Sequence, residues 1–322
     1  MKTSLSASRR VTFGFVELVV NGIPVQQDRD TGSHDPEHLT LGKWQIADRD
    51  IRSISVVEEQ TRLEFVDEES RVHKVVLRVL PDPDPLTRAI NYGLSRRQYA
   101  ERLEQVATRH QGHLTRQADC PWCEARLLVM DGGEGWSPQV WCEYCDSLFT
   151  IDPVEGLGDT ERDYRICPEC LMYSRPRRFS EAYFYFLIIH AGVHHTTTRC
   201  CSGCMRPRAW RMVLGNLPGL LGLPFAMTQL VRVYRDSTGP GPLRGLDSAN
   251  RMLRRGRTTR ALARYSAIME RHPVSAGVLY NVALGLVAGG DPDNARRTLQ
   301  LALENCPNYR PAREKLEALE VG

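Results

Sequence analysis

Four cysteine pairs follow one another between residues 120 and 204, and two residues separate the cysteines of each pair. This spacing lets both sulfurs of a tight turn face one tetrahedral Zn²⁺ ion. One such pair is weak evidence, because redox-active dithiols share the spacing. Four pairs in succession supply eight thiolates and therefore predict two structural Zn²⁺ ions. The expected ligands are Cys120, Cys123, Cys142, Cys145, Cys167, Cys170, Cys201 and Cys204.

Bulk composition limits the remaining choices. The chain has 322 residues, of which 42% are apolar and 25% charged, which is typical of a globular protein with several domains. A net charge of +3 gives no strong overall attraction to nucleic acid or to an acidic membrane. Nine of the ten cysteines lie between residues 120 and 204, as in metal sites rather than disulfide frameworks. No apolar core of signal-peptide length follows Arg9 and Arg10, so we expect a cytoplasmic protein.

Residues 1–112 are predicted to form a β-rich domain that ends in a helix. The segment 11–20 is β-branched and aromatic, and Asn21-Gly22 after it is a strong hairpin signal. The polar segment 27–37 is predicted to be a mobile loop, and 86–110 an amphipathic helix. Further strands are expected over 39–47, 51–58, 62–66 and 72–80.

Several strands followed by one closing helix resemble the pleckstrin-homology-like architecture. The resemblance rests on the order of the elements alone, and no function is carried over from it. An unrelated α+β domain or a β-roll is the alternative.

Residues 118–152 resemble a zinc ribbon. Two knuckles, Cys120–Cys123 and Cys142–Cys145, are separated by 18 residues, which suffice for two short strands and a loop at 131–135. So small a unit has almost no apolar core, so metal binding would supply most of its folding free energy. Residues 163–211 resemble a second ribbon with a long insertion that contains the apolar run 183–189.

Two alternatives remain for the cysteines. Cys200 could replace Cys201 as a ligand, although Cys201 keeps the two-residue gap. The pairs could also alternate, first with third and second with fourth, as in RING-like modules. We prefer sequential pairing, because the first two knuckles already make a compact unit. On a helix, His190 and His194 would share a face, which raises a third metal site as a further alternative.

Residues 212–231, within an apolar segment that extends to 236, contain no charged side chain. Their length approaches that of a membrane span, but Pro218 and Pro224 argue against one straight helix. We favour a pair of short helices that packs between the cysteine modules and the C-terminal region. A hairpin lying on a membrane surface, with peripheral membrane association of the protein, is the alternative.

The C-terminal region, residues 242–322, repeats with a period of 34 and is expected to end in a capping helix over 311–319. This pattern resembles a pair of tetratricopeptide repeats, which implies helix pairs that bind a peptide or a partner protein. Arg251, Arg254 and Arg255 are the candidate partner-binding residues, for an acidic peptide or a C-terminal carboxylate. The repeated positions are Gly256, Ala261, Tyr265, Ile268 and Pro273, matched by Gly290, Ala295, Leu299, Ala302 and Pro307.

Together these patterns predict a multidomain α+β chain: a β-rich N-terminal domain, two zinc-ribbon-like modules and C-terminal helical repeats. The favoured function is a non-enzymatic zinc-binding scaffold that binds another protein through residues 242–322. The alternative is a nucleic-acid-binding protein, because arginines surround the second cysteine set and aromatic residues the first. Catalysis is disfavoured, because sites with four cysteine ligands have no open coordination position.

Overall fold

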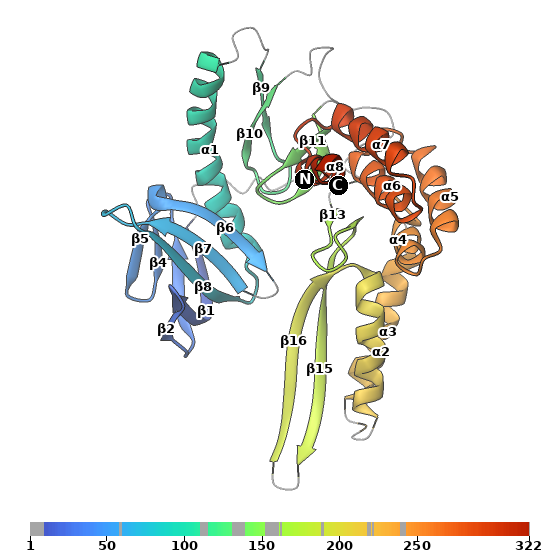
Figure 1. Ribbon diagram of the computed structural model, residues 1–322. Coiled ribbons are helices and arrows are strands. Elements are labelled where there is room, and N and C mark those ends of the chain that lie inside the picture. The colour runs from blue at the N-terminus through green and yellow to red at the C-terminus, as the bar shows by residue number, and fades with distance from the viewer. Residues whose placement is uncertain are drawn as a thin grey trace, which may run out of the picture. The chain divides into compact units, whose positions relative to one another are not determined.

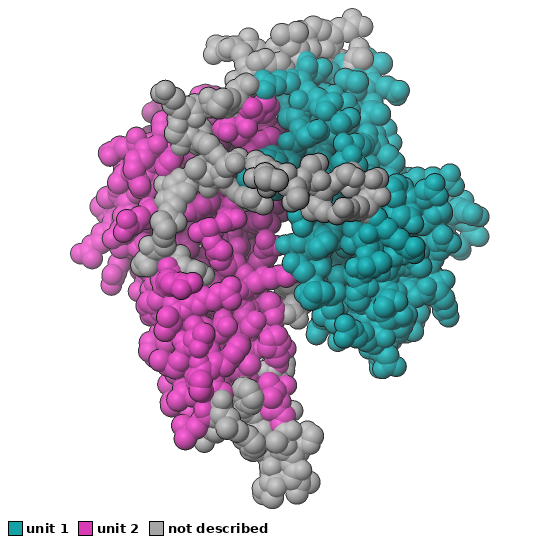
Figure 2. Space-filling model, turned by 180° about the vertical axis from the view of Figure 1, so that it is seen from behind, with its two compact units in different colours: residues 1–131 teal, residues 132–322 magenta. Residues whose placement is uncertain are grey.

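The computed structural model describes residues 10–57, 60–109, 115–130, 139–151, 161, 163–187, 190–217, 220, 222–238 and 243–321 (Figure 1). The chain forms two compact units, residues 1–131 and 132–322, which Figure 2 colours separately. Strands and helices are both present in quantity, so the mixed α+β class is confirmed.

The first unit is built on an antiparallel sheet with the strand order β5-β4-β3-β1-β8-β7-β6, to which β2 adds by pairing with β1. Its inward side chains include Phe15, Leu18 and Leu77, which are almost fully buried. The alternating burial along β8 matches the alternation in its sequence. The strands are β1 (Val11–Val20), β2 (Ile23–Gln26), β3 (Asp30–His34), β4 (His38–Leu41), β5 (Trp44–Ala47), β6 (Ile51–Val57), β7 (Gln60–Val66) and β8 (Val72–Leu80).

The predicted hairpin at Asn21-Gly22 is confirmed, since both residues have positive φ and join β1 to β2. The loop predicted over 27–37 is wrong, because β3 crosses it and pairs with both β1 and β4. Gly32 allows this pairing, since a Cβ there would lie 2.5 Å from the Phe13 ring. The strand predicted over 39–47 is two strands, β4 and β5, joined by a turn at Gly42, whose φ is +57°.

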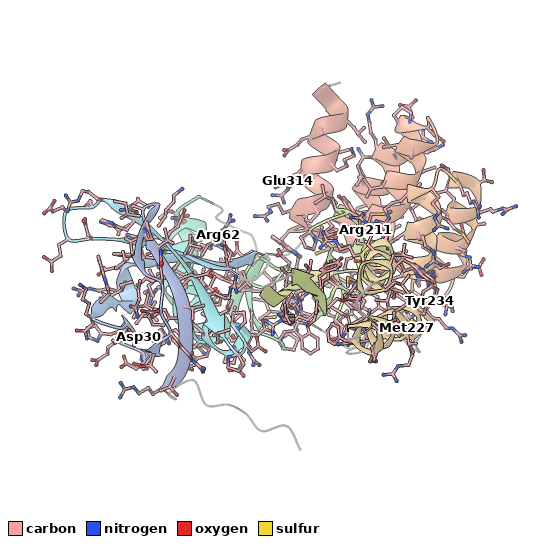
Figure 3. The ribbon with its side chains drawn as sticks, turned by 90° about the horizontal axis from the view of Figure 1, so that it is seen from below. Asp30, Arg62, Arg211, Met227, Tyr234 and Glu314 are labelled. Carbon is pink, nitrogen blue, oxygen red and sulfur yellow. The ribbon has the colours of Figure 1, made fainter. Side chains whose placement is uncertain are left out.

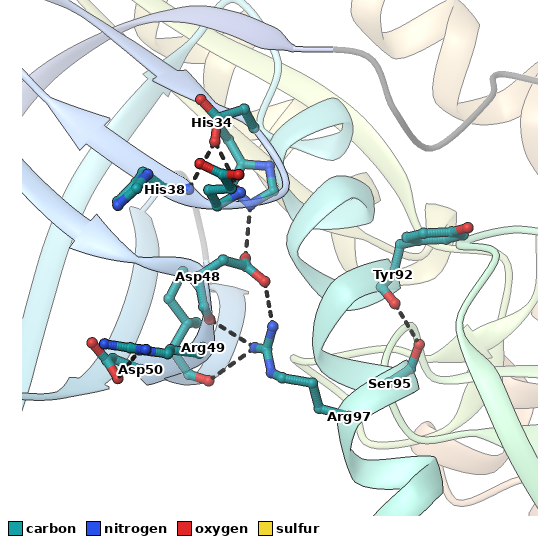
Figure 4. A network of polar contacts seen from close by, with 11 residues as sticks. His34, His38, Asp48, Arg49, Asp50, Tyr92, Ser95 and Arg97 are labelled. Carbon is teal, nitrogen blue, oxygen red and sulfur yellow. Dashed lines mark hydrogen bonds and ion pairs between the residues drawn. The ribbon is translucent and has the colours of Figure 1, made fainter.

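Helix α1 (Asp84–Arg109) follows the sheet, close to the prediction. It is tied to the sheet through Asp48, a carboxylate that is almost fully buried (Figure 4). Arg97 of α1 donates to Asp48 Oδ2 and, at 2.7 Å, to the Asp48 carbonyl. Nε2 of His34 lies 2.9 Å from the other carboxylate oxygen. Burial alone would raise the pKa of Asp48, but the bonds from His34 and Arg97 outweigh it and hold that pKa below its usual range.

Three pairs of short strands accompany the first three cysteine pairs. They are β9 (Thr115–Asp119) with β10 (Arg126–Met130), β11 (Gln139–Cys142) with β12 (Ser147–Thr150), and β13 (Arg165–Ile166) with β14 (Tyr173–Ser174). The loop predicted over 131–135 lies outside the described residues.

The predicted insertion is a long β-hairpin of β15 (Arg177–Leu187) and β16 (His190–Cys200). His190 and His194 therefore lie on a strand, and the helical spacing considered for them is wrong. The apolar segment that follows forms two helices, α2 (Ser202–Asn216) and α3 (Leu223–Thr238). Both helices are longer than expected. Helix α2 already begins at the last cysteine pair, and α3 extends to Thr238. They pack on β15 around Phe179, Met205 and Met212.

Five further helices form the C-terminal region: α4 (Leu246–Arg254), α5 (Thr258–Met269), α6 (Ala276–Ala288), α7 (Pro292–Asn305) and α8 (Arg310–Val321). Each contacts the next along the chain, as expected for stacked helix pairs, and α8 lies where the capping helix was predicted. The repeated residues Ala261, Ala295, Leu299 and Ala302 are fully buried. Among the described residues, no helix is long and apolar enough to cross a membrane.

Candidate metal centres

The eight cysteines of the four pairs gather into two groups of four. The first pair joins the second, and the third joins the fourth. Within each group, all sulfur atoms lie within 4.8 Å of one another. The pairing is therefore sequential, and the alternating arrangement considered from the sequence is wrong.

Three of the four pairs share one local geometry. The backbone N–H of the residue after the second cysteine donates to the carbonyl of the first cysteine at 2.8–2.9 Å. These residues are Glu124, Asp146 and Leu171, and their φ values are 57°, 57° and 55°. A left-handed conformation is unfavourable for non-glycine residues, so the surrounding contacts must hold each turn.

The fourth pair differs from the other three. Cys201 lies at the N-terminus of α2, and Cys204 lies in its first turn, where Met205 N donates to Cys201 O at 3.1 Å. Here the helix itself turns both sulfurs to one side. The second group therefore joins one strand-bound knuckle to one helix start.

The sulfur separations fit a tetrahedral Zn²⁺ ion. With Zn–S bonds of about 2.3 Å, the edge of a tetrahedron of sulfurs measures about 3.8 Å. In the second group, the sulfurs of Cys170 and Cys201 lie 3.8 Å apart, and those of Cys167 and Cys204 lie 4.0 Å apart. Both groups could thus each hold one metal ion, and thiolate sets of four favour zinc among the common divalent ions.

Polar neighbours of the second group would favour ionised sulfur. Cys201 N donates to Cys167 Sγ at 3.3 Å, and Arg254 Nη1 donates to Cys204 Sγ at 3.0 Å. Gly203 makes room for this arginine, since a Cβ there would lie 2.8 Å from the guanidinium. Hydrogen bonds among the four thiols lower the pKa of Cys167 and raise the pKa values of Cys170, Cys201 and Cys204, so in the absence of metal the group favours one ionised sulfur. Four thiolates around one divalent ion carry a net charge of −2, which Arg254 partly compensates.

Cys200 does not belong to the second group, although it is fully buried beside Cys201. Burial, with Glu169 and Cys167 nearby, raises the pKa of Cys200 to about 12. Cys200 is the last residue of β16, and it is Cys201, which keeps the two-residue gap, whose sulfur lies in the group.

The C-terminal helices bind the backbone of Tyr173, which follows the Cys167–Cys170 knuckle. The N–H of Tyr173, in β14, donates to Asn281 Oδ1 at 2.8 Å, and its carbonyl accepts from Asn250 and Asn281 at 2.8 and 2.7 Å. Both asparagines are almost fully buried. Gly277 admits the Tyr173 ring, since a Cβ there would lie 2.4 Å from it. The repeats and the knuckle thus share one core.

The same helices also contact the strand before the Cys142–Cys145 knuckle. Gln139 Oε1 accepts from Ala276 N at 2.8 Å, and the side chain of Asn308 bonds both N and O of Trp141. These contacts join residues more than 130 positions apart, and no local sequence pattern indicates them.

The predicted partner-binding arginines have different surroundings. Arg254 is exposed, but its guanidinium donates to Cys204 Sγ, which links it to the second cysteine group. Arg251 is half-buried and bonds Ser248, while Arg255 is exposed. The role of Arg254 could not be inferred from the sequence, because it lies 50 residues from Cys204.

Comparison of the chain with protein-family models, with curated proteins and with solved structures finds no match.

Proposed function

We propose that this protein is a non-enzymatic, zinc-stabilised scaffold that binds another protein through residues 242–322. The observation that carries the proposal is the shared core of the C-terminal helices and the cysteine-bearing strands. This core makes the helices a preformed platform, and preformed surfaces lose less conformational entropy on binding. Four thiolates would fill the tetrahedral shell of each Zn²⁺ ion, which supports structural rather than catalytic metal.

The resemblance to tetratricopeptide repeats supports binding through the C-terminal helices, but the inner contacts narrow the surface. Helices α4 and α6 already contact β14 through Asn250 and Asn281. We therefore place partner binding on exposed arginines of the α4–α5 pair, here called the basic face. It consists of Arg255, Arg257, Arg260 and Arg264.

The charge of the basic face indicates an acidic segment as its partner. Arg257, Arg260 and Arg264 recur at helical spacing in and before α5 and so share one side of it. Asp247, a half-buried acidic residue of α4, accepts a hydrogen bond from Ser202 Oγ at 2.8 Å and does not neutralise this side. Guanidinium groups bind carboxylates in a bidentate manner, and exposed clusters of one sign accelerate association with the opposite sign.

The test is affinity capture with the full-length, zinc-loaded protein as bait. The bait variant Arg257→Glu/Arg260→Glu is compared with Arg49→Glu/Arg62→Glu, which reverses two exposed arginines of the other unit. We expect a directly bound protein whose affinity falls about tenfold or more in the first variant and is unchanged in the control. The absence of any such arginine-dependent protein, with a folded bait, would contradict the proposal.

Nucleic acid is the second candidate, because the same four exposed arginines would also suit phosphates. A mixed-sequence single-stranded oligonucleotide serves as the probe in fluorescence anisotropy at several salt concentrations. Binding that weakens steeply with salt and is lost in Arg257→Glu/Arg260→Glu favours this candidate. Flat titrations at low salt exclude it for this face.

A further inference from the structure

The helical hairpin α2–α3 carries an unusual concentration of exposed apolar side chains. Among the described residues, half of the large hydrophobic side chains that are strongly exposed belong to it, with exposed fractions between 41% and 64%. An apolar surface of this extent commonly marks an interaction site. We call these residues the apolar stripe: Trp210, Leu214, Leu217, Leu220, Met227, Val231 and Tyr234.

The stripe is continuous along one side of the hairpin. Successive members of the stripe are four and then three residues apart on α2, and the same spacing holds on α3. Residues spaced in this way lie on one face of a helix. Trp210 Nε1 donates to Tyr234 OH at 3.3 Å, which aligns the two helices at the base of the uncharged part of the hairpin. In Figure 3, where the hairpin is seen from its tip, Met227 and Tyr234 project on the same side of α3. The opposite faces, with Met212 and Val233, are buried on β15.

Charge and polarity are ordered along the hairpin axis. From 212 to 231, which includes the tip, the sequence contains no charged residue. The aromatic pair Trp210 and Tyr234 lies at this base, where the Arg206 guanidinium carbon is 4.1 Å from the centre of the Tyr234 ring. Arg211, Arg232 and Arg235 are exposed on the neighbouring turns of the two helices. Leucine toward the tip, followed by tryptophan, tyrosine and arginine at about one level, matches the order of acyl chain and polar interface in a bilayer.

The β15–β16 hairpin extends beside α2–α3 toward the same end (Figure 1). By sequence, residues 182–193 of this hairpin contain no Asp, Glu, Lys or Arg. Val193 on β16 is 54% exposed. The described arms of both hairpins therefore run in the same direction, and by sequence the segments that join the arms carry no Asp, Glu, Lys or Arg.

We propose that the apolar stripe docks the protein on an anionic lipid bilayer, with the tip of α2–α3 inserted into one leaflet. From Arg211 to Leu217 the helix rises about 9 Å. This depth suits an interfacial element and stays within one leaflet, whose hydrocarbon layer is roughly 15 Å thick. The arginines at the base then meet lipid phosphates. A protein groove would accept an apolar stripe as well, but it would not require uncharged residues around the whole tip.

Vesicle flotation with the full-length protein tests this proposal, which is independent of the proposed function. Vesicles of phosphatidylcholine alone are compared with vesicles that also contain about 30% phosphatidylglycerol, which makes their surface strongly anionic. The variant Leu214→Glu/Val231→Glu changes two side chains that are 60% and 61% exposed. Val72→Glu, at a position in the other unit that is 59% exposed, is the matched control.

We expect binding to anionic vesicles, a loss of about a hundredfold in the double variant, and no change in the control. Arg211→Gln and Arg235→Gln should each weaken binding about fivefold and reduce its salt sensitivity. Lipids brominated on their acyl chains should quench fluorescence of the wild type, and Trp210→Phe should lose this quenching. Circular dichroism and zinc content verify that every variant is folded.

Three results would overturn the proposal. The folded wild type could fail to float with vesicles of either composition. It could bind equally well after Leu214→Glu/Val231→Glu. Finally, light scattering could show that the wild type is an oligomer, that Leu214→Glu/Val231→Glu is a monomer, and that vesicles do not change the oligomeric state. This result would assign the stripe to contact with a second copy of the chain.

Discussion

Single buried polar side chains hold distant segments together in this protein. Asn281 is the clearest case, because its amide bonds both backbone groups of Tyr173 and the side chain of Asn250. Tyr265 OH completes the set by donating to Asn250 at 2.7 Å. A buried polar group that loses its partner costs more free energy than a hydrogen bond contributes, so these residues act as a unit.

Replacing Asn281 by Ala should therefore be strongly destabilising. It leaves the N–H and carbonyl of Tyr173 without this partner, and we expect a loss of about 3 kcal/mol in the free energy of unfolding. Urea denaturation measures it. Gln300→Ala, at an exposed position of α7, is the control and should change stability by less than about 0.5 kcal/mol. Equal stability of the two variants would contradict the structural role of Asn281.

Asp48 should make the first unit sensitive to acid. Because its pKa is lowered in the folded state, its contribution is complete above the ordinary pKa of a free aspartate. The contribution is lost as the pH falls through the lowered folded value. Asp48→Asn removes the ion pair with Arg97, so it should lower the melting temperature at pH 7.

The measurement is the difference in melting temperature between wild type and Asp48→Asn from pH 7 to pH 2. We expect this difference to shrink as the pH falls below about 4. A difference that stays constant over the range would show that protonation of Asp48 does not matter. Asp50→Asn, at a more exposed carboxylate two residues away, is the control.

At the scale of elements, the cysteine pairs are of two kinds. Three are tight turns between strands, in which a non-glycine residue adopts a left-handed conformation. The fourth is the first turn of α2, so one side of the second group is supplied by a helix that also builds the apolar hairpin. Formation of the second group therefore couples the start of α2 to the knuckle that precedes β14.

Neighbouring cysteines provide a direct test of this geometry. Cys201→Ser should reduce the zinc content from two ions per chain to one, because it removes one of four ligands. Cys200→Ser should keep two ions, although Cys200 is equally buried. Elemental analysis of protein purified without added metal or chelator measures both. If Cys200→Ser loses an ion and Cys201→Ser does not, the metal ligand is Cys200 and the geometry described above is contradicted.

At the scale of the whole molecule, two units carry separate hydrophobic cores. The sheet of the first unit encloses one core, while the C-terminal helices share theirs with the strands around Trp141 and Tyr173. The α2–α3 hairpin packs on a further cluster that includes Cys167 and Cys201. Zinc in the second group should thus support the helices of the second unit as well as the knuckles.

Calorimetry should show this coupling. In Cys201→Ser, the melting transition of the second unit should fall by about 10 °C, since a loss of some 3 kcal/mol shifts a unit of this size by that amount. The transition of the first unit should stay in place, and Asp48→Asn identifies it by shifting it alone. An unchanged second transition would show that the helices do not depend on this cysteine group.

Local patterns determined much of this protein. The two-residue spacing selected Cys201 over Cys200, Asn21-Gly22 specified the first hairpin, and the period of 34 placed the buried alanines of α5 and α7. These features depend on neighbours along the chain or on a repeated face, so their physical causes are written in short segments.

Tertiary structure decided the rest. Strand β3 has a polar sequence, but pairing with β1 and β4 on both sides satisfies its backbone and overrides the loop tendency. Arg254 became a neighbour of Cys204, and Asn281 a partner of Tyr173, only when segments 50 and 108 residues apart met. A side chain's role is set by what lies against it after folding. Spacing along the chain therefore identified the cysteine ligands expected at the two centres, whereas only packing revealed what holds them in place.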